Sequence, residues 1–319
     1  MKSGFDYAHL PHTHLYEGPL TEHELICSYR HLILALHSAL RIYSISSSLL
    51  VRSLPLETAS GRKAVVTGFS MSPTYPNHIY VSTSRGRLEI WDWIEGTKIQ
   101  RWEFESEINA LATISTSLAE DKSDIIYMIE KKYGKWRIKL FELVKGAEPS
   151  KTDNQTKVLY ECEHQISSLR VLHEGRVVVA ISGKCLVIGT AKGEVAAGSY
   201  MWMEFTSPDW LTCLDARESS KESISAKSKK EKPKANAASK SNPAIDVVVG
   251  DIKGVMFIHS DLLNRLIPDD EADKSTRLEH LVRGASRRRH WHREAVHSVK
   301  WSLDGERQRS ISCRYKIAY

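Results

Sequence analysis

The sequence predicts an all-β fold in which one group of short strands returns along the chain. Amphipathic helical periodicity is hard to find in the 319 residues, whereas short runs of β-branched and aromatic residues alternate with turn residues. A hydrophobic share of 41% is enough to build a sizeable core. We therefore expect a globular protein built from β-hairpins.

Five predicted hairpins carry the repeat. The first, in HLILALHSALRIYSI, has strands at Leu32 to Leu36 and Leu40 to Ile45. The others lie in NHIYVSTSRGRLEIWDW, DIIYMIEKKYGKWRIKLFEL, RVVVAISGKCLVIGTA and AIDVVVGDIKGVMFIHS. In these hairpins a glycine lies between the paired strands, where a tight turn often needs a positive φ: Gly86, Gly134, Gly183 and Gly254. The first hairpin lacks this glycine.

The spacing of the hairpins identifies the repeating unit. Equivalent positions are Ile33, Tyr80, Ile126, Val178 and Val247. Their separations are 47, 46, 52 and 69 residues, and leaving out the 28 residues from Arg217 to Ala244 reduces the last to 41. A period in the forties, with strands in series and no intervening helices, indicates four-stranded β-propeller blades.

Flanking runs supply two further strands to a unit: KAVVTGFS and KIQRWEF in the second, INALATI and KVLYEC in the third, ISSLRVL and YMWMEF in the fourth. Because a blade cannot bury both of its faces alone, neighbouring blades must stack around an axis. We expect an incomplete propeller of about five blades plus the first strand of another. That last strand begins at Val296 and Val299 and ends near Trp301 and Ser302.

Cysteine usage and hydropathy indicate the compartment. The cysteines, which form no C-x-x-C pair and are odd in number, are Cys27, Cys162, Cys185, Cys213 and Cys313. This pattern fits neither a disulfide framework nor a zinc ribbon. There is no apolar run of about 18 residues, and the N-terminal MKSGFDYAHLPHTH lacks the apolar core of a secretory signal. We expect a soluble cytosolic or nuclear protein.

One unit carries a family landmark, the Trp91–Asp92 dipeptide that ends the third strand of WD (WD40) repeats. Its hydrophobic strand, its basic hairpin, WDWIEGTKI and the following INAL resemble the nucleolar WD-repeat subunit of the UtpA (t-UTP) subcomplex of the small-subunit processome. This is the NET1-associated nuclear protein family. LRIYSISSSLLVRSL and HWHREAVHSVKWSLDG are similar to further landmarks, so the resemblance runs from about Glu24 to Gly305.

The resemblance implies a noncatalytic scaffold of the nucleus and nucleolus, without cofactor, membrane or small-molecule substrate. It implies as partners the other UtpA WD-repeat proteins, the 5′ external transcribed spacer of pre-rRNA and the U3 small nucleolar ribonucleoprotein. The implied roles are 18S rRNA maturation and ribosomal-DNA transcription. Family members carry two tandem propellers. We therefore expect a tail at residues 1–23, a partial WD40 propeller at 24–305 and an atypical tail at 306–319, as a truncated product or a faulty gene model would leave.

A histidine cluster, His290, His292 and His297, raises the question of a metal site. No cysteine or carboxylate is spaced to complete a zinc site. His292 lies where WD repeats carry a histidine that hydrogen-bonds within the blade, and Trp301 closes the following strand. We therefore interpret His292 and Trp301, like Trp91 and Asp92, as structural. His9, His12 and His14 fall in the expected N-terminal tail, and we predict no metal.

No enzyme motif is present: G-x-S-x-G, a P-loop, H-E-x-x-H and C-x-x-C are all missing. The aromatic residues on or beside predicted strands are expected to fill the wedges between blades: Trp91, Trp102, Trp136, Trp202 and Trp210. Only Trp291, beside Arg287 to Arg289, offers an exposed aromatic among arginines, and packing is the favoured role there too.

Two segments concentrate positive charge. Arg217 to Ala244 carries Arg217 and seven lysines against three glutamates and is expected to be a disordered loop. Arg277 to Arg293 carries six arginines against Glu279. The first joins strands one and two of the fifth unit, and Ser260 to Ser286 joins strands three and four, so both should lie on one face of that blade.

The candidate phosphate contacts on this face are Lys227, Lys229, Lys230, Lys232, Lys234, Arg287, Arg288 and Arg289. A solvated loop or a nuclear-import signal in KSKKEKPK explains the lysines equally well. The alternative to a processome scaffold is thus a WD-repeat adaptor in an unrelated complex, with no RNA role.

Overall fold

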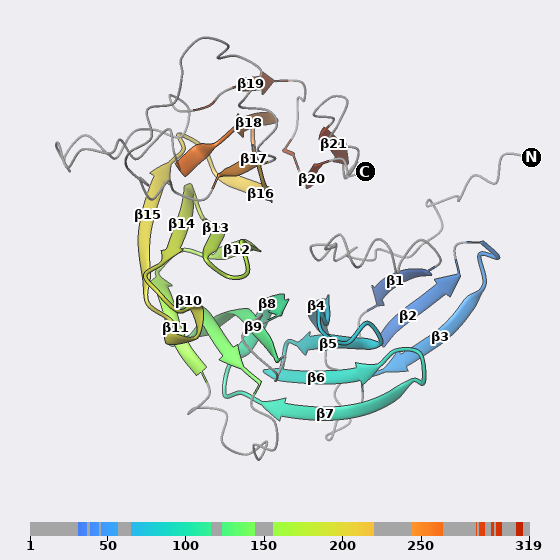
Figure 1. Ribbon diagram of the computed structural model, residues 1–319. Helices are drawn as coiled ribbons and strands as arrows, with labels where there is room; N and C mark the ends of the chain where they lie inside the picture. Colours follow the sequence, from blue (N-terminus) through green and yellow to red (C-terminus); the bar gives the residue numbers. More distant parts are fainter. Residues whose placement is uncertain are drawn as a thin grey trace, which may run out of the picture. The chain divides into compact units, whose positions relative to one another are not determined.

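A computed structural model describes residues 31–36, 39–44, 46–56, 65–115, 123–143, 156–219, 244–263, 285, 287–290, 295–296, 298–301 and 311–314. In these residues the architecture is all-β, and every strand pair is antiparallel (Figure 1). The chain divides into two compact units, Met1–Glu161 and Cys162–Tyr319.

The first unit opens with a three-stranded sheet of β1 (His31–Leu36), β2 (Ala39–Ser44) and β3 (Leu50–Pro55), in that order. These bounds confirm the predicted first hairpin to within one residue, and Ile45 lies outside the described residues. Exposed Leu49, Leu50 and Val51 mark the turn into β3.

Two four-stranded meanders follow. One consists of β4 (Val66–Met71), β5 (His78–Thr83), β6 (Arg87–Asp92) and β7 (Thr97–Glu103). The other consists of β8 (Glu107–Ser115), β9 (Asp124–Lys132), β10 (Lys135–Glu142) and β11 (Thr156–Cys162). The strand order in each sheet is the chain order, as the sequence predicts.

The second unit contains two more meanders. One comprises β12 (Ile166–Leu172), β13 (Val177–Ser182), β14 (Cys185–Ala191) and β15 (Tyr200–Thr206), with the short 3-10 helix η3 (Val195–Ala197) before β15. The other comprises β16 (Leu211–Glu218), β17 (Ile245–Asp251), β18 (Val255–His259) and β19 (Arg287–His290). A two-stranded sheet of β20 (Ser298–Trp301) and β21 (Ile311–Arg314) completes the described strands.

How deeply a strand is buried depends on its position within the meander. The second strands β9, β13 and β17 are buried along nearly their whole length, so they read as continuous apolar runs. The outer strand β7 instead alternates exposed and partly buried residues along most of its length, as a strand with one solvated face does. This contrast explains why the hairpins dominate the sequence pattern while the outer strands are harder to recognise.

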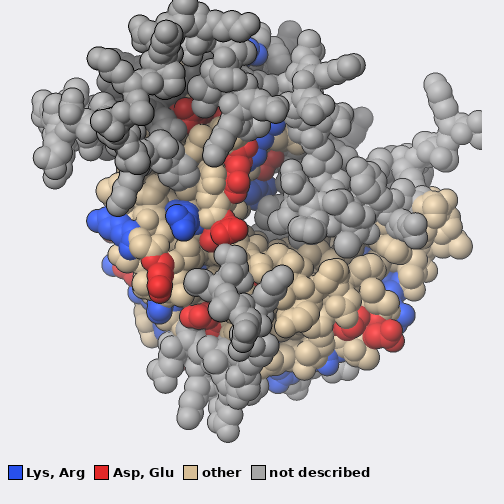
Figure 2. Space-filling view, in the orientation of Figure 1, with Lys and Arg blue, Asp and Glu red and all other residues tan. Residues whose placement is uncertain are grey.

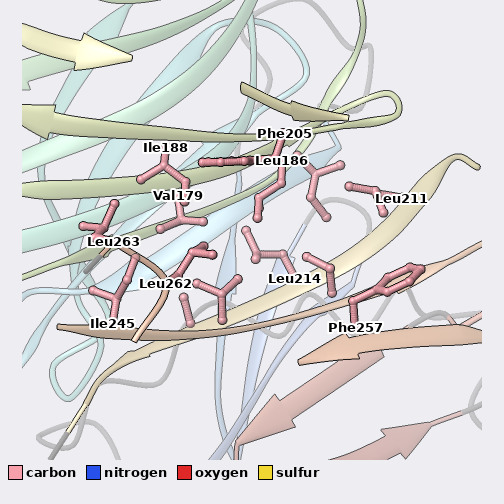
Figure 3. Packing of buried hydrophobic residues seen from close by; sticks show 14 of the residues in the cluster. Val179, Leu186, Ile188, Phe205, Leu211, Leu214, Ile245, Phe257, Leu262 and Leu263 are labelled. Atoms are coloured by element: carbon pink, nitrogen blue, oxygen red, sulfur yellow. The ribbon is translucent and has the colours of Figure 1, made fainter. Parts of the chain in front are cut away.

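The core of the second unit lies between its two meanders (Figure 3). Val179, Leu186 and Ile188 point toward side chains of the next sheet. Those partners include Leu214, Ile245 and Phe257, and the cluster is extended by Leu262 and Leu263 after β18. In the first unit, one cluster of buried residues includes Trp91 and another includes Trp102.

The glycine prediction is confirmed. Each predicted turn glycine has a positive φ: Gly86 at 68°, Gly134 at 78°, Gly183 at 61° and Gly254 at 80°. These angles are accessible to glycine without the steric penalty that a β-carbon brings.

The structure corrects three details of the sequence interpretation. Arg217 is not in a loop: it lies in β16, opposite Asp246 of β17. Trp210 does not fill the core, because it is 48% exposed in the connection before β16. The expected single strand ending at Trp301 has a partner, since β21 pairs with β20 over four residue pairs.

Candidate functional site

The candidate site is the end of the β16–β19 sheet at which β16 and β18 end and β17 and β19 begin. In an antiparallel meander, the connections one–two and three–four emerge at the same end. Glu218 pairs with Ile245, and Ile258 pairs with Arg287, so the described ends of both connections lie there. The predicted convergence of the two basic segments at one end of one sheet is therefore confirmed for their attachment points.

Two of the predicted phosphate contacts are exposed at this end. Arg287 and Arg288 lie in the outer strand β19, opposite Ile258 and Phe257, and both are exposed. The Arg288 guanidinium lies 5.9 Å from the centroid of the Phe257 ring. Arg289 is opposite Met256 in the backbone register. The other candidates lie outside the described residues: Lys227, Lys229, Lys230, Lys232, Lys234, His292 and Trp291.

Asp246 contacts residues at the attachment points of both long connections. Its carboxylate accepts hydrogen bonds from the Ser219 hydroxyl at 2.6 Å and the Asp261 backbone N–H at 3.1 Å. It also forms an ion pair with the Arg217 guanidinium at 3.2 Å. One buried carboxylate thus binds residues at the start of both long connections. The Arg217 side chain makes its contacts inside the second unit, because its guanidinium also lies 4.3 Å from the Trp301 ring centroid.

A second buried acid, Asp215, holds β20 against β16. The Arg170 Nε donates to Asp215 Oδ1 at 3.0 Å, and the Trp301 backbone N–H donates to Oδ2 at 2.8 Å. Trp301 is therefore structural through its backbone as well as its ring. Sequence reasoning missed Arg170 and Asp215, although a charged residue inside the apolar runs ISSLRVL and LTCLDARE was the available signal.

A turn from the neighbouring sheet also contacts this end. His173 and Glu174, between β12 and β13, both have positive φ, at 50° and 53°. The His173 backbone N–H donates to the Glu218 carboxylate at 2.6 Å, and its ring Nε2 lies 3.1 Å from the Ala244 carbonyl oxygen. These contacts hold the ends of β16 and β17 against the β12–β13 turn as well.

The Trp91–Asp92 pair lies in the first unit and makes structural contacts. Trp91 is buried, and its indole N–H donates to Glu89 at 2.9 Å. Asp92 accepts the backbone N–H groups of Glu95 at 2.9 Å and Ile94 at 3.0 Å, which closes the β6–β7 turn. The Glu95 hydrogen bond is the main reason that the pKa of Asp92 lies below its ordinary value.

Charges of both signs are interspersed among the described residues visible in Figure 2. Within those residues, no three His, Cys, Asp or Glu side chains are grouped so that they could hold a metal ion. No helix in the described part of the chain has the length and apolar character needed to span a bilayer.

The arrangement presents two exposed arginines on a rigid sheet edge, at the place where a lysine-rich segment is attached. Such an edge can bind phosphate groups without reading base sequence. Comparison with protein-family models finds no match, and no curated protein is similar in sequence.

Proposed function

We propose that this chain is a noncatalytic WD-repeat scaffold built on a WD40-type β-propeller, of the kind found in the UtpA subcomplex of the small-subunit processome. The observation that supports the architecture is the serial run of four-stranded meanders, with the Trp–Asp dipeptide at the end of a third strand. Rigid sheets that display loops at their ends suit a protein whose task is to hold partners together.

RNA contact is proposed at the β16–β19 end. Arg287 and Arg288 are exposed there, and the attached segment contributes Lys227 to Lys234. Cations that contact phosphates release counterions, so the resulting affinity is independent of base sequence and depends strongly on salt. Many weak contacts of this kind, summed over one rigid surface, retain a large RNA.

In this proposal the protein acts in the nucleolus with other UtpA WD-repeat proteins. It binds the 5′ external transcribed spacer of pre-rRNA close to the U3 small nucleolar ribonucleoprotein. It thereby supports 18S rRNA maturation and ribosomal-DNA transcription. The resemblance of WDWIEGTKI, INAL and HWHREAVHSVKWSLDG to that family is what favours this setting over another intracellular complex.

Crosslinking in cells tests the proposal. The tagged chain is crosslinked with ultraviolet light and purified under denaturing conditions, and its attached RNA is sequenced. We expect pre-rRNA and U3 RNA to be enriched over a tag-only control. Normal expression without enrichment of either RNA contradicts the proposal and favours an adaptor in which the lysine segment serves only nuclear import.

A further inference from the structure

The tip of the β9–β10 hairpin, in the first unit, presents an exposed aromatic ring in an unfavourable backbone conformation. Tyr133 and Gly134 connect Lys132 to Lys135, with φ of 53° and 78°. Positive φ at both central residues is the signature of a type I′ turn, which favours Asn or Gly at each position. Tyr133 is 85% exposed, so packing does not explain its presence.

A bulky residue with positive φ weakens its own turn, because its β-carbon crowds the backbone. Local conflicts of this kind concentrate where a side chain is needed for binding. The neighbouring position shows that the tip is open: a β-carbon on Gly134 would meet no described atom within 4 Å. The ring of Tyr133 is thus exposed at the open tip of the hairpin at a cost to the turn.

Positive charge surrounds this ring. Residues 131–137 contain Lys131, Lys132, Lys135 and Arg137 and no acid. The Lys132 Nζ lies 5.3 Å from the Tyr133 ring centroid and 2.7 Å from a carboxylate oxygen of Glu105. Lys135 and Arg137 share Glu161, at 2.7 Å and 2.6 Å. Lys132, Lys135 and Arg137 therefore face two carboxylates, and Lys131 lies opposite Glu107 in the strand register. Phosphate oxygens can replace these carboxylates because surface ion pairs are weak.

The base of the hairpin is firmly anchored. Trp136 is buried and lies opposite Lys131 in the register, with the Lys131 Nζ 5.5 Å from its ring centroid. Three residues further along β10, buried Lys139 forms an ion pair with buried Glu130 at 2.9 Å. The tip is therefore carried on rigid strands, which lowers the entropy lost when a ligand orders the exposed side chains.

We propose that the Lys131–Arg137 tip is a second RNA contact, which binds one unpaired nucleotide of a single-stranded region. The base stacks on the Tyr133 ring, and Lys132 and Lys135 contact the flanking phosphates. Every base has an aromatic face, so the site accepts any unpaired base and excludes paired ones. This inference rests on the proposed function in one respect only: that function makes pre-rRNA the single-stranded RNA that the tip binds in cells.

Direct binding by the purified full chain tests this site. Fluorescence anisotropy measures the affinity for a short, adenine-rich single-stranded RNA with the unmodified chain, Tyr133→Gly and Tyr133→Phe. Loss of one stacked base weakens binding by about 5- to 150-fold in Tyr133→Gly. Tyr133→Phe keeps the ring and retains affinity to within about twofold. Because glycine suits the positive φ, Tyr133→Gly folds at least as stably as the unmodified chain, so its loss of binding is not a loss of structure.

Two further measurements make the result specific. Tyr75→Ala removes another exposed tyrosine of the first unit, 40% exposed, and leaves the affinity unchanged. A duplex RNA, which has no free base, binds the Tyr133→Gly variant and the unmodified chain equally. The proposal is wrong if Tyr133→Gly keeps its affinity for single strands, or loses as much for the duplex. Dependence on Tyr133 for a polyglutamate peptide but not for RNA would indicate an acidic protein partner instead.

The outcome is independent of the cellular experiment. If pre-rRNA is not recovered from cells while purified protein binds single strands through Tyr133, the processome role fails and the tip site stands. If pre-rRNA is recovered and Tyr133→Gly binds normally in solution, the tip site fails and the scaffold role stands.

Discussion

Individual buried charges connect the sheets of this protein. In the first unit, Asp124 at the start of β9 accepts hydrogen bonds from the hydroxyls of Tyr80, in β5 of the preceding sheet, and of Ser72, directly after β4. In the second unit, Arg170 of β12 and Asp215 of β16 play the equivalent role. A buried charge is tolerated only when it is paired or hydrogen-bonded, so each of these residues specifies how two adjacent sheets pack.

Tyr80→Phe tests one such connection. Burial is the main cause that raises the pKa of the Tyr80 phenol far above its ordinary value, so the hydroxyl stays protonated and donates to Asp124 at 2.7 Å. Its removal leaves a buried carboxylate with one donor fewer. We expect the free energy of unfolding to fall by about 1.5–3 kcal/mol, measured by urea denaturation followed by tryptophan fluorescence. Tyr75→Phe, at a site 40% exposed, should change it by less than about 0.5 kcal/mol. Equal effects of the two substitutions would show that the Asp124 contact adds nothing.

The exposed arginines of β19 give a second prediction at this scale. Arg287→Gln with Arg288→Gln should weaken RNA binding most at low salt. The slope of log affinity against log salt concentration should flatten by about 0.7 for each lost phosphate contact on a single strand. Filter binding over a salt series measures this slope. The control is Arg41→Gln with Arg85→Gln, which removes the same charge from exposed positions of the first unit. A slope that stays the same in the β19 variant, or changes equally in the control, would refute the role of these arginines.

At the scale of elements, the hairpins were the most predictable part of the molecule. Their central strands are buried on both faces and carry continuous β-branched runs, and four of the five turns contain a glycine with positive φ. The order of strands within each sheet followed from the short connections between them.

What could not be predicted depends on contacts between residues far apart in the sequence. Arg170 and Asp215 are 45 positions apart, and no local pattern indicates that they meet. The strand β21 is only four residues long and is specified by its pairing with β20, so a period in the sequence does not reveal it. Tyr133 resembles an ordinary hairpin residue until its positive φ and its exposure are known.

Alanine substitutions at two turn glycines, Gly86 and Gly134, can be compared directly because both residues have a positive φ. Gly86→Ala places a β-carbon against the carbonyl oxygens of Phe104 and Ser106 at a positive φ, whereas Gly134→Ala meets no described atom within 4 Å. We expect a loss of about 2–4 kcal/mol for Gly86→Ala, from strain plus overlap. Gly134→Ala should lose about 1 kcal/mol, from strain alone. Urea midpoints compare the two. If both cost the same, the tight packing of the Gly86 turn does not contribute to stability.

For the whole molecule, the distribution of charge is uneven. The formal net charge is +6, and residues 220–243 contribute seven lysines against two glutamates. Residues 220–243 and the segment Arg277 to Arg293 each carry a net charge of +5, so together they exceed the net charge of the whole chain. A charge concentrated in this way determines nonspecific attraction to polyanions and has little influence on the fold.

Replacement of residues 220–243 by Asn-Gly tests this separation of roles. The Ser219 N–H already donates to the Ala244 carbonyl at 3.1 Å, so a two-residue turn can join the strands. The shorter loop should leave stability unchanged or raise it by up to about 2 kcal/mol. RNA affinity and its salt slope should fall, as measured by filter binding. A variant of full length with glutamine in place of the seven lysines is the control for length. If both variants bind RNA as the unmodified chain does, the segment does not contribute to RNA binding. Its role would then be another one, such as nuclear import, which imaging of the tagged variants in cells measures.

The clamp around Asp246 has a consequence for how this protein can change. Arg217, Ser219 and Asp261 meet on one carboxylate at the roots of two long connections. The first of these connections can therefore be changed in length without loss of the contacts that Asp246 makes at its root, whereas the second continues directly into the buried residues Leu262 and Leu263. The same place is a natural graft point, where an epitope or a fluorescent domain can be carried by an otherwise unaltered scaffold.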